Sequence, residues 1–399
     1  MRSPTVAGER WAVAGVFAVH GAAVGTFASR LPWIADRLRL GPGQLGIALT
    51  MAAIGALSGT PLAARFVHRY GGRSATRIAM TAWCAALVLP ALSPNLPALA
   101  IALAVCGFTS SVADVAMNGQ GVDVEVRLGR SIMSGLHGCW SVGSAVGAFA
   151  GSLFAGAGID ARVQFAVVAA VLIALGALAT TRFSAGTRAP ESGRPLFTIP
   201  RGRVLLIGLV GFCAVFPEWT ANDWSAVYVR RVLQADEARA ALATTMFALS
   251  MTVGRLLGDF VIRRIGARRT VLASGLAAST GAILVTVAWS VPVALAGFVL
   301  LGTGVAVVVP LTFAAGGRAG TSPDAGVAGV ATISYSAGLA APGIVGGVAA
   351  VASLRGAFVL VAVFATLVAA GARLLGGPLD TPASGDALVP PPERAGAPE

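Results

Sequence analysis

Lysine is absent from this sequence, and charge of either sign is scarce. All 29 basic residues are arginines, and only 12% of the 399 residues are charged, against about 25% in an average soluble domain. The absence of lysine excludes a Walker A phosphate loop, a pyridoxal Schiff base and a protein-kinase ATP site, because each of them needs a lysine. The chain therefore does not hydrolyse ATP by these routes.

Histidine and cysteine are scarce as well. The chain has three histidines and four cysteines, and no two of them stand at a CxxC or zinc-ligand spacing. We therefore expect no metal or other cofactor, no ligand cluster of a membrane-embedded enzyme, and cysteines that act as small apolar packing residues. These residues are His20, His68 and His137, and Cys84, Cys106, Cys139 and Cys213.

What the sequence has in abundance is apolar length. Hydrophobic residues make up 56% of the chain, and its mean hydropathy is +0.80. A helix needs about 20 apolar residues to cross about 30 Å of hydrocarbon, and runs of this kind recur along the whole chain. The sequence predicts an all-α polytopic membrane protein with twelve transmembrane helices. The predicted spans are 11–33, 45–67, 76–94, 97–119, 132–157, 163–181, 204–229, 240–262, 270–289, 292–315, 326–350 and 355–375.

The arginines lie mostly in the connections between these spans. In a soluble protein a net charge of +12 suggests nucleic acid, but this placement indicates a bilayer instead. With a cytoplasmic N-terminus, all arginines fall on the inner side except eight, so the positive-inside rule predicts an inner-membrane protein with both termini in the cytoplasm. Arg255 is counted here with the inner arginines. The eight outer ones are Arg30, Arg37, Arg39, Arg162, Arg230, Arg231, Arg239 and Arg355.

The sequence repeats itself at a shift of 195 residues. The aligned pairs include Gly59 with Gly254, Arg69 with Arg264, Gly71 with Gly266, Arg73 with Arg268, Gly107 with Gly302, Trp140 with Tyr335, and Gly143 with Gly338. Two parallel six-helix halves are typical of secondary transporters, whose substrate site lies between the halves. We predict halves at 1–181 and 204–375, a cytoplasmic linker at 182–203, and a disordered tail at 376–399.

Two loops indicate a family. Arg65-Phe-Val-His-Arg-Tyr-Gly-Gly-Arg73 and its repeat, 254–269, resemble the loop signature of the major facilitator superfamily, and the resemblance spans nearly all of 10–375. In that family the loop carries an Asp followed by Arg-x-Gly-x-Arg and locks the cytoplasmic side through charge pairs. His68 replaces the first Asp, and Asp259 is expected to replace the second. The resemblance implies a cytoplasmic gate of Arg69, Gly71, Arg73, Asp259, Arg264, Gly266 and Arg268.

A narrower resemblance lies in the fourth span. Asp114-Val-Ala-Met-Asn118 is similar to the Glu-x-x-x-Asn step of fucose-permease-like proton symporters and their uncharacterised bacterial members. The fifth span lacks the Gly-Pro-x-x-Gly-Gly element of proton-coupled drug antiporters, although 342–347 in the eleventh span resembles part of it. The resemblance favours symport. Gly143, Gly147 and Gly151 stand in place of that element at the spacing of close helix packing, and a role in coupling is the alternative.

Ionisable residues inside spans are functional candidates, because each costs about 2.5–3.5 kcal/mol to insert. Asp114 and His137 lie in the hairpin of the fourth and fifth spans, where we expect them within reach of one another and suited to exchange a proton. The alternative is that Asp114 pairs with Arg127 or Arg130. Glu218, central in the seventh span, completes the predicted proton-coupling residues.

Carboxylates, amides and indoles together suit a sugar or polyol. In the seventh span, Glu218 shares one helical face with Asn222, and Trp219 shares the neighbouring face with Asp223. An aromatic belt or outer gate is the alternative interpretation for Asp223 and Trp224, and a packing role is the alternative for His20. The predicted substrate-binding residues are His20, Asn118, Trp140, Asn222 and Asp223.

The sequence as a whole predicts a secondary active transporter of a small polar solute, sugar- or polyol-like, that works by alternating access and proton symport. A proton-coupled drug or metabolite exporter of the same fold is the alternative. We expect a monomer whose partners are the solute, protons and the lipid bilayer, with no nucleic acid. A sensor needs a soluble output domain, and neither the linker nor the tail has room for one.

Overall fold

The computed structural model describes residues 6–184 and 200–375. The predicted tail at 376–399 lies outside the described residues, and the predicted linker at 182–203 is described only at its two ends. The helices are α1 (Val6–Ser29), α2 (Leu31–Arg37), α3 (Pro42–Tyr70), α4 (Gly72–Ala86), α5 (Leu89–Leu92), α6 (Leu96–Leu128), α7 (Met133–Gly156), α8 (Ala161–Thr180), α9 (Gly202–Val232), α10 (Glu237–Ile265), α11 (Ala267–Val287), α12 (Val291–Val305), α13 (Val308–Ala319), α14 (Pro323–Val351), α15 (Leu354–Gly371) and the 3₁₀ helix η1 (Ala372–Leu375).

Twelve helical segments in the described part of the chain are long and apolar enough to cross a membrane, as the sequence predicts. Several run beyond the predicted bounds. The fourth span is predicted at 97–119, whereas α6 continues to Leu128. Its last turns carry Asp123, Glu125 and Arg127, which lower the hydropathy without breaking the helix. Hydropathy therefore locates the apolar part of a helix and misses a polar extension of it.

Side-chain caps and glycines set the helix ends. The Asn95 side chain accepts a hydrogen bond from the Ala98 N–H at the start of α6, and Asp236 caps α10 in the same way through Arg239. Gly71 and Gly266, which the repeat aligns, separate α3 from α4 and α10 from α11. Their φ angles are 75° and 80°, a conformation that favours glycine, so the repeat extends to backbone geometry.

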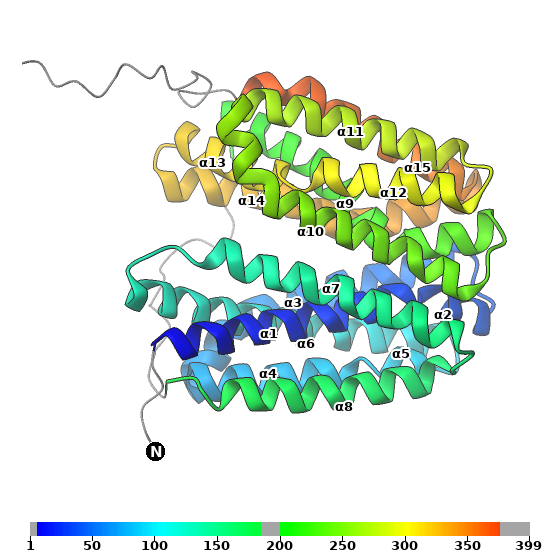
Figure 1. The fold of residues 1–399 in the computed structure, drawn as a ribbon, viewed down its shortest axis with the longest axis horizontal. Helices are drawn as coiled ribbons and strands as arrows, with labels where there is room; N and C mark the ends of the chain where they lie inside the picture. The colour runs from blue at the N-terminus through cyan, green and yellow to red at the C-terminus, as the bar shows by residue number, and fades with distance from the viewer. Residues whose placement is uncertain (1–5, 185–199, 376–399) are drawn as a thin grey trace, which may run out of the picture.

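The helices form two halves, α1 to α8 and α9 to α15, which lie side by side in Figure 1. Equivalent contacts recur in both. A Cβ added at Gly107 would lie 1.8 Å from the Ala52 carbonyl oxygen, and one at Gly302 would lie 2.7 Å from the Phe247 carbonyl oxygen. The shift of 195 residues maps both members of the first pair onto the second. The pseudo-symmetry of the halves therefore extends to their internal packing.

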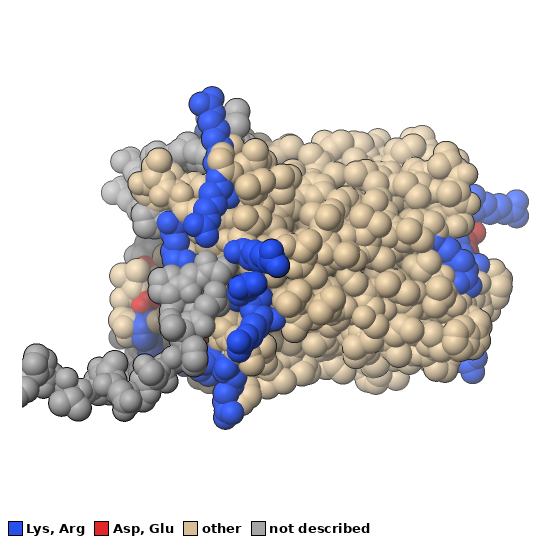
Figure 2. Space-filling view, turned by 90° about the horizontal axis from the view of Figure 1, so that it is seen from above, with Lys and Arg blue, Asp and Glu red and all other residues tan. Residues whose placement is uncertain are grey.

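Charge is concentrated at the two ends of the bundle. Figure 2 shows a broad belt without charged side chains, and on this face most arginines gather at one end. We call the end with Val6, Gly71 and Gly266 the arginine-rich end. The end with Arg30 and Glu237 is called the opposite end. An uncharged belt between two charged ends is the surface that a lipid bilayer requires.

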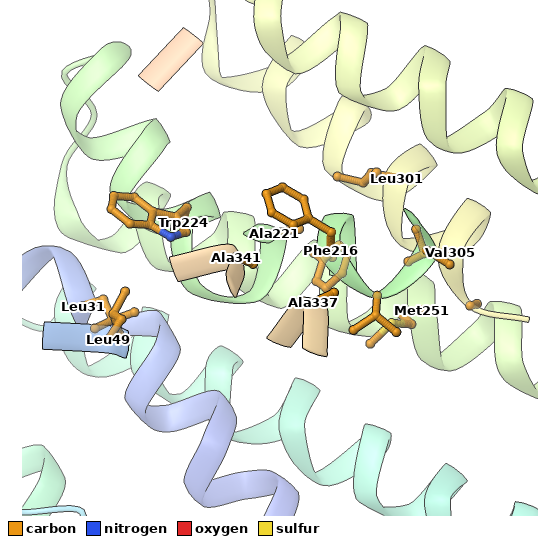
Figure 3. Close-up of a cluster of buried hydrophobic side chains, with 14 of the residues drawn as sticks. Leu31, Leu49, Phe216, Ala221, Trp224, Met251, Leu301, Val305, Ala337 and Ala341 are labelled. Carbon is orange, nitrogen blue, oxygen red and sulfur yellow. The ribbon is translucent and has the colours of Figure 1, made fainter. Parts of the chain in front are cut away.

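The halves meet along two helix pairs, α7 with α10 and α3 with α14. A Cβ at Gly46 would lie 2.8 Å from the Gly346 Cα, so α3 and α14 touch backbone to backbone. Figure 3 shows an apolar cluster that joins Leu31 and Leu49 of the first half to Trp224 of the second. These contacts hold the halves together and leave the polar side chains at mid-helix between them.

Candidate functional site

Polar side chains from six helices gather at mid-bundle, and we call them the central cluster. Its members are His20 on α1, Asp114 on α6, His137, Trp140 and Ser141 on α7, Glu218 on α9, Arg255 on α10 and Tyr335 on α14. Five of them belong to the first half of the molecule and three to the second. Hydrogen bonds and electrostatic contacts connect them, as described below.

Glycines bring α1 and α7 into close contact around this cluster. A Cβ at Gly21 would lie 2.0 Å from the carbonyl oxygen of Trp140, and one at Gly143 would lie 2.1 Å from that of Ala18. Gly147 stands in the same relation to Ala22. The packing interpretation of the glycine stripe in the fifth span is therefore confirmed. Close packing of the two backbones is what places Trp140 beside α1.

His20 is buried and uses both ring nitrogens. Its Nδ1 accepts a hydrogen bond from the Trp140 indole N–H at 2.9 Å, while Nε2 lies 3.3 Å from the Ser110 carbonyl oxygen and 3.2 Å from the Ser110 hydroxyl. An indole nitrogen only donates, so Nδ1 carries a lone pair and Nε2 carries the proton. The ring also packs 5.7 Å from Trp83. This geometry suits a residue that positions Trp140 better than one that binds solute directly.

Asp114 has no ion-pair partner among the described residues. Its carboxylate accepts one hydrogen bond, from the Asn118 amide at 3.2 Å, and the same amide donates to the Asp114 carbonyl oxygen at 2.8 Å. Arg127 binds Glu9 at 2.6 Å and Asp123 at 2.9 Å instead. The alternative in which Asp114 pairs with Arg127 or Arg130 is therefore wrong, because no ion pair in the described residues joins Asp114 to either arginine.

His137 lies on the exposed side of α7. Its ring stands edge-on to Phe17 at 5.4 Å. Asp114 is within electrostatic range of both His137 and His20, but no hydrogen bond in the described part of the chain joins it to His137. Asp114 and His137 are thus near enough to interact electrostatically, as predicted, but they do not share a hydrogen bond.

Arg255 links the two halves at this level. It donates to the Glu218 carboxylate at 2.9 Å and to the Ser141 hydroxyl at 2.9 Å. The loop signature at 254–269 treats Arg255 as a loop residue, and this is wrong, because Arg255 lies within α10. It lies ten residues before the end of α10 at Ile265, about 15 Å of helix. The apolar residues that follow Arg255 could have shown that it lies inside the span. Four further arginines shortly after them made the whole stretch resemble a loop.

Tyr335, like Arg255 and Ser141, is a member of the cluster that was not selected from the sequence as a site residue. Its side chain is 58% exposed although it lies in the middle of α14, and it is within electrostatic range of Glu218, Asp114 and Arg255. The repeat aligns it with Trp140, which was the signal that pointed to it. The two halves thus contribute one aromatic residue each at equivalent positions.

Asn222 and Asp223 lie apart from the central cluster. The Asn222 amide donates to the Asp223 carboxylate at 3.0 Å, and in the described residues neither has a hydrogen bond or ion pair to the cluster. Trp224 is completely buried within the apolar cluster of Figure 3. The aromatic-belt interpretation is therefore wrong for Trp224, because a belt residue faces lipid. The position of Trp224 in the predicted span indicates how deep it lies in the membrane. It does not indicate whether the side chain faces lipid or the protein interior.

Ion pairs cross between the halves at the opposite end. Arg30, which is 2% exposed, donates to the Glu237 carboxylate at 2.9 Å and to the Ile159 carbonyl oxygen at 2.9 Å. Asp36 binds Arg230 at 2.9 Å and Arg231 at 3.6 Å. Burial lowers the pKa of the Arg30 guanidinium, and the Glu237 carboxylate opposes that shift. We call these five charged residues the charged bridge.

In the described part of the chain, the residues of the predicted cytoplasmic gate do not form ion pairs with one another. Arg69 lies over the ring of Tyr70 at 5.8 Å, and Arg264 over that of Phe260 at 5.0 Å. Asp259 is exposed and forms no ion pair with another described residue. Arg73 is half-buried, and Arg268 lines a surface pocket. Within residues 6–184 and 200–375, no ion pair joins the halves at the arginine-rich end.

Comparisons with known proteins agree on one family. A family model described as Major Facilitator Superfamily matches residues 13–319. The chain is 34% identical over 358 residues to an uncharacterized MFS-type transporter of Yersinia pestis, covering 90% of this chain and 93% of that protein. It is 33% identical over 365 residues to the uncharacterized transporter y4wD of Sinorhizobium fredii, covering 91% of this chain and 97% of that protein.

A solved structure shares the fold. The crystal structure of a mutant of the nucleoside transporter NupG superposes with a TM-score of 0.75 at 12% identity, covering 92% of this chain and 99% of that one. A likeness at this identity concerns the fold alone. The family model, in contrast, covers more than half of the sequence. This chain belongs to the major facilitator superfamily, a family of membrane transporters and not of enzymes.

Proposed function

We propose that this protein carries a small polar solute, sugar- or polyol-like, across the plasma membrane together with protons. The solute binds in the central cluster between the halves, which expose it to one side of the membrane at a time. Both termini lie in the cytoplasm, so the arginine-rich end faces inward and obeys the positive-inside rule. Asp114 is the proton carrier, and Trp140 and Tyr335 contact the solute.

The observation that carries this proposal is the charge balance of the central cluster. Asp114 and Glu218 are two carboxylates, and Arg255 is the one arginine bonded there, to Glu218, among the described residues. His20 is held in a neutral tautomer. Asp114 is left as an unpaired carboxylate inside a span, where an uncompensated charge is costly. With His137 in its neutral form, protonation of Asp114 makes the cluster neutral, which favours rearrangement of the halves around a neutral solute.

The two ends of the bundle differ in their ion pairs, and this difference also supports the proposal. Ion pairs between the halves cluster at the opposite end. In the described residues the charged bridge joins the halves there, whereas no ion pair does so at the arginine-rich end. Alternating access needs one closed and one openable side in each state. This asymmetry supports a state in which the outer side is closed and the solute leaves Asp114 toward the cytoplasm.

Asp114→Asn tests the coupling. The variant mimics a permanently protonated carboxyl, so uphill accumulation should fall to the level of empty vesicles, while exchange of internal for external solute continues because exchange needs no proton cycle. The measurement is uptake into proteoliposomes with a pH gradient, after the solute has been identified from a panel of sugars, polyols and nucleosides. Nucleosides are included because NupG is a nucleoside transporter.

Asp123→Asn is the matched control. It changes the same residue type on the same helix, and Asp123 pairs with Arg127 away from the cluster, so accumulation should persist. Solute-dependent alkalinisation of the medium around de-energised cells should accompany symport. Acidification would identify the exporter instead. Accumulation by Asp114→Asn against a gradient would contradict the coupling role and make Glu218 the next candidate.

A further inference from the structure

A pocket lies at the arginine-rich end of the second half, away from the central cluster. Its volume is about 330 Å³, and it opens between α11 and the junction of α15 with η1. Two arginines and four apolar residues line it, and none of the six is acidic. The lining residues are Arg268, Leu272, Ala369, Ala370, Ala372 and Arg373. A basic opening with an apolar wall suits a ligand that has an anionic head and an apolar body.

The pocket lies where two membrane spans end. Arg268 is the second residue of the span that begins at Ala267, and Arg373 is near the end of the span that finishes at Leu375. Both arginine side chains are exposed. A deeper contact closes the pocket, since a Cβ added at Gly275 would lie 2.4 Å from the backbone nitrogen of Ala369. The pocket is therefore a notch at the membrane surface and not a channel into the bundle.

An apolar surface continues from the pocket along both helices. On α11, Leu272 is 44% and Leu276 is 55% exposed, and on α15 Leu367 is 47% and Val363 is 48% exposed. These side chains follow helical spacing and face the uncharged belt that the bilayer covers. An acyl chain can lie along them while its headgroup stays at the level of the arginines.

The repeat does not explain this pocket. In the first half, the same shift places Arg77 at the position of Leu272, and its guanidinium binds the Thr180 hydroxyl at 3.0 Å and the Ala177 carbonyl oxygen at 3.4 Å. The counterpart of Arg373 is Leu178. Arginine at this end serves topology in both halves, and in the second half two arginines, Arg268 and Arg373, also line this pocket.

We propose that this pocket binds the phosphate headgroup of an anionic phospholipid, with Arg268 and Arg373 as the phosphate ligands and the acyl chains along α11 and α15. Guanidinium groups match phosphate oxygens in geometry, and basic pockets between transmembrane helices on the cytoplasmic side bind anionic headgroups. The inference does not depend on the transported solute. A free phosphate shares the headgroup chemistry but lacks the apolar part.

The test uses the purified full chain in nanodiscs of phosphatidylcholine with a minor fraction of phosphatidylglycerol. Lipid that remains bound after transfer to detergent is counted by native mass spectrometry. We expect retention of phosphatidylglycerol over phosphatidylcholine. Arg373→Gln should weaken that retention about fivefold, the contribution of one arginine at an anionic surface. Arg318→Gln is the matched control, because Arg318 is an exposed arginine of the same half and end outside the pocket.

A second variant separates the pocket from bulk charge. Ala370→Phe fills the notch without changing any charge, so it should reduce phosphatidylglycerol retention as Arg373→Gln does. Equal retention in Arg373→Gln, Arg318→Gln and the parent chain would overturn the proposal. So would displacement of the lipid by millimolar inorganic phosphate, which would identify a site for a free anion. Thermal unfolding of each variant in detergent shows whether it is folded.

Discussion

At the scale of single residues, variants of His20 can show whether this residue positions Trp140 or binds the solute itself. His20→Phe keeps the ring packing against Trp83 but leaves the Trp140 indole N–H without an acceptor. Trp140 is half-buried, and a fully buried donor without a partner costs about 1–3 kcal/mol, so a cost near the lower end should move the indole from its present orientation. We expect the KM for solute to rise about tenfold in His20→Phe, which corresponds to the lower part of this range of energies. Initial rates of uptake at varied solute concentration measure this.

His20→Asn is the conservative counterpart. Its side-chain oxygen can take the place of Nδ1 and accept the Trp140 N–H, so the KM should return toward the parent value. A residue that binds solute through its own ring would lose affinity in both variants alike. Unchanged affinity in His20→Phe would contradict the positioning role of the His20 to Trp140 hydrogen bond.

The residue types themselves predicted much of the central cluster. His20, Asp114, His137 and Glu218 were selected because a polar group inside a span is costly, and all four lie at mid-bundle. The same rule missed Arg255, because nearby arginines on the same helix made it look like part of a loop. The direction of Asp223 could not be predicted, since a one-residue shift turns a side chain by about 100° and no apolar pattern marks its face.

At the scale of helices, the contact of α1 with α7 makes a stability prediction. A Cβ at Gly147 would lie 2.1 Å from the Ala22 carbonyl oxygen, so Gly147→Ala forces the two helices apart. Overpacking of this kind costs about 1–3 kcal/mol. We expect a lower Tm in detergent and, because Trp140 shifts away from His20, weaker solute binding. Thermal unfolding followed by circular dichroism measures the first effect.

Gly135→Ala on the same helix is the matched control. A Cβ there meets nothing within 4 Å, so the substitution should be neutral or slightly stabilising through helix propensity. Equal melting temperatures for the two variants would contradict the backbone contact. The sequence indicated this contact through the spacing of its glycines, but it could not tell which helix they face. That partner is decided by tertiary packing alone.

At the scale of the whole molecule, two helix pairs and one charged bridge hold the halves together. The twelve spans and the two halves were predictable, because hydropathy and a repeat are properties of long stretches of sequence. The bridge was not, because Arg30 and Glu237 are 207 positions apart and belong to different halves. The sequence places Arg30 among the eight outer arginines, yet its side chain is buried. Only the docking of the halves brings the two charges together.

The charged bridge predicts how the opposite end opens. Glu237→Gln leaves the buried Arg30 without its carboxylate, and because Glu237 is itself 34% exposed, the cost lies below the about 3–5 kcal/mol of breaking a fully buried pair. Asp36→Asn breaks exposed pairs, which are worth about 0–1 kcal/mol. Glu237→Gln should therefore shift the population toward a state open at the opposite end far more than Asp36→Asn does. The readout is the reaction rate of a cysteine that replaces the buried Ala35, in a chain without the four native cysteines.

The pair of variants is its own control, since each removes one negative charge from the same bridge. In Glu237→Gln the cysteine should react about tenfold faster, because the Arg30 charge that loses its partner is buried, and in Asp36→Asn only a few-fold faster, because both members of that pair are partly exposed. Arg30→Gln with Glu237→Gln removes both charges of this pair and should partly restore protection, because no lone charge then stays buried at Arg30. Protection unchanged in Glu237→Gln would show that apolar packing alone closes this end.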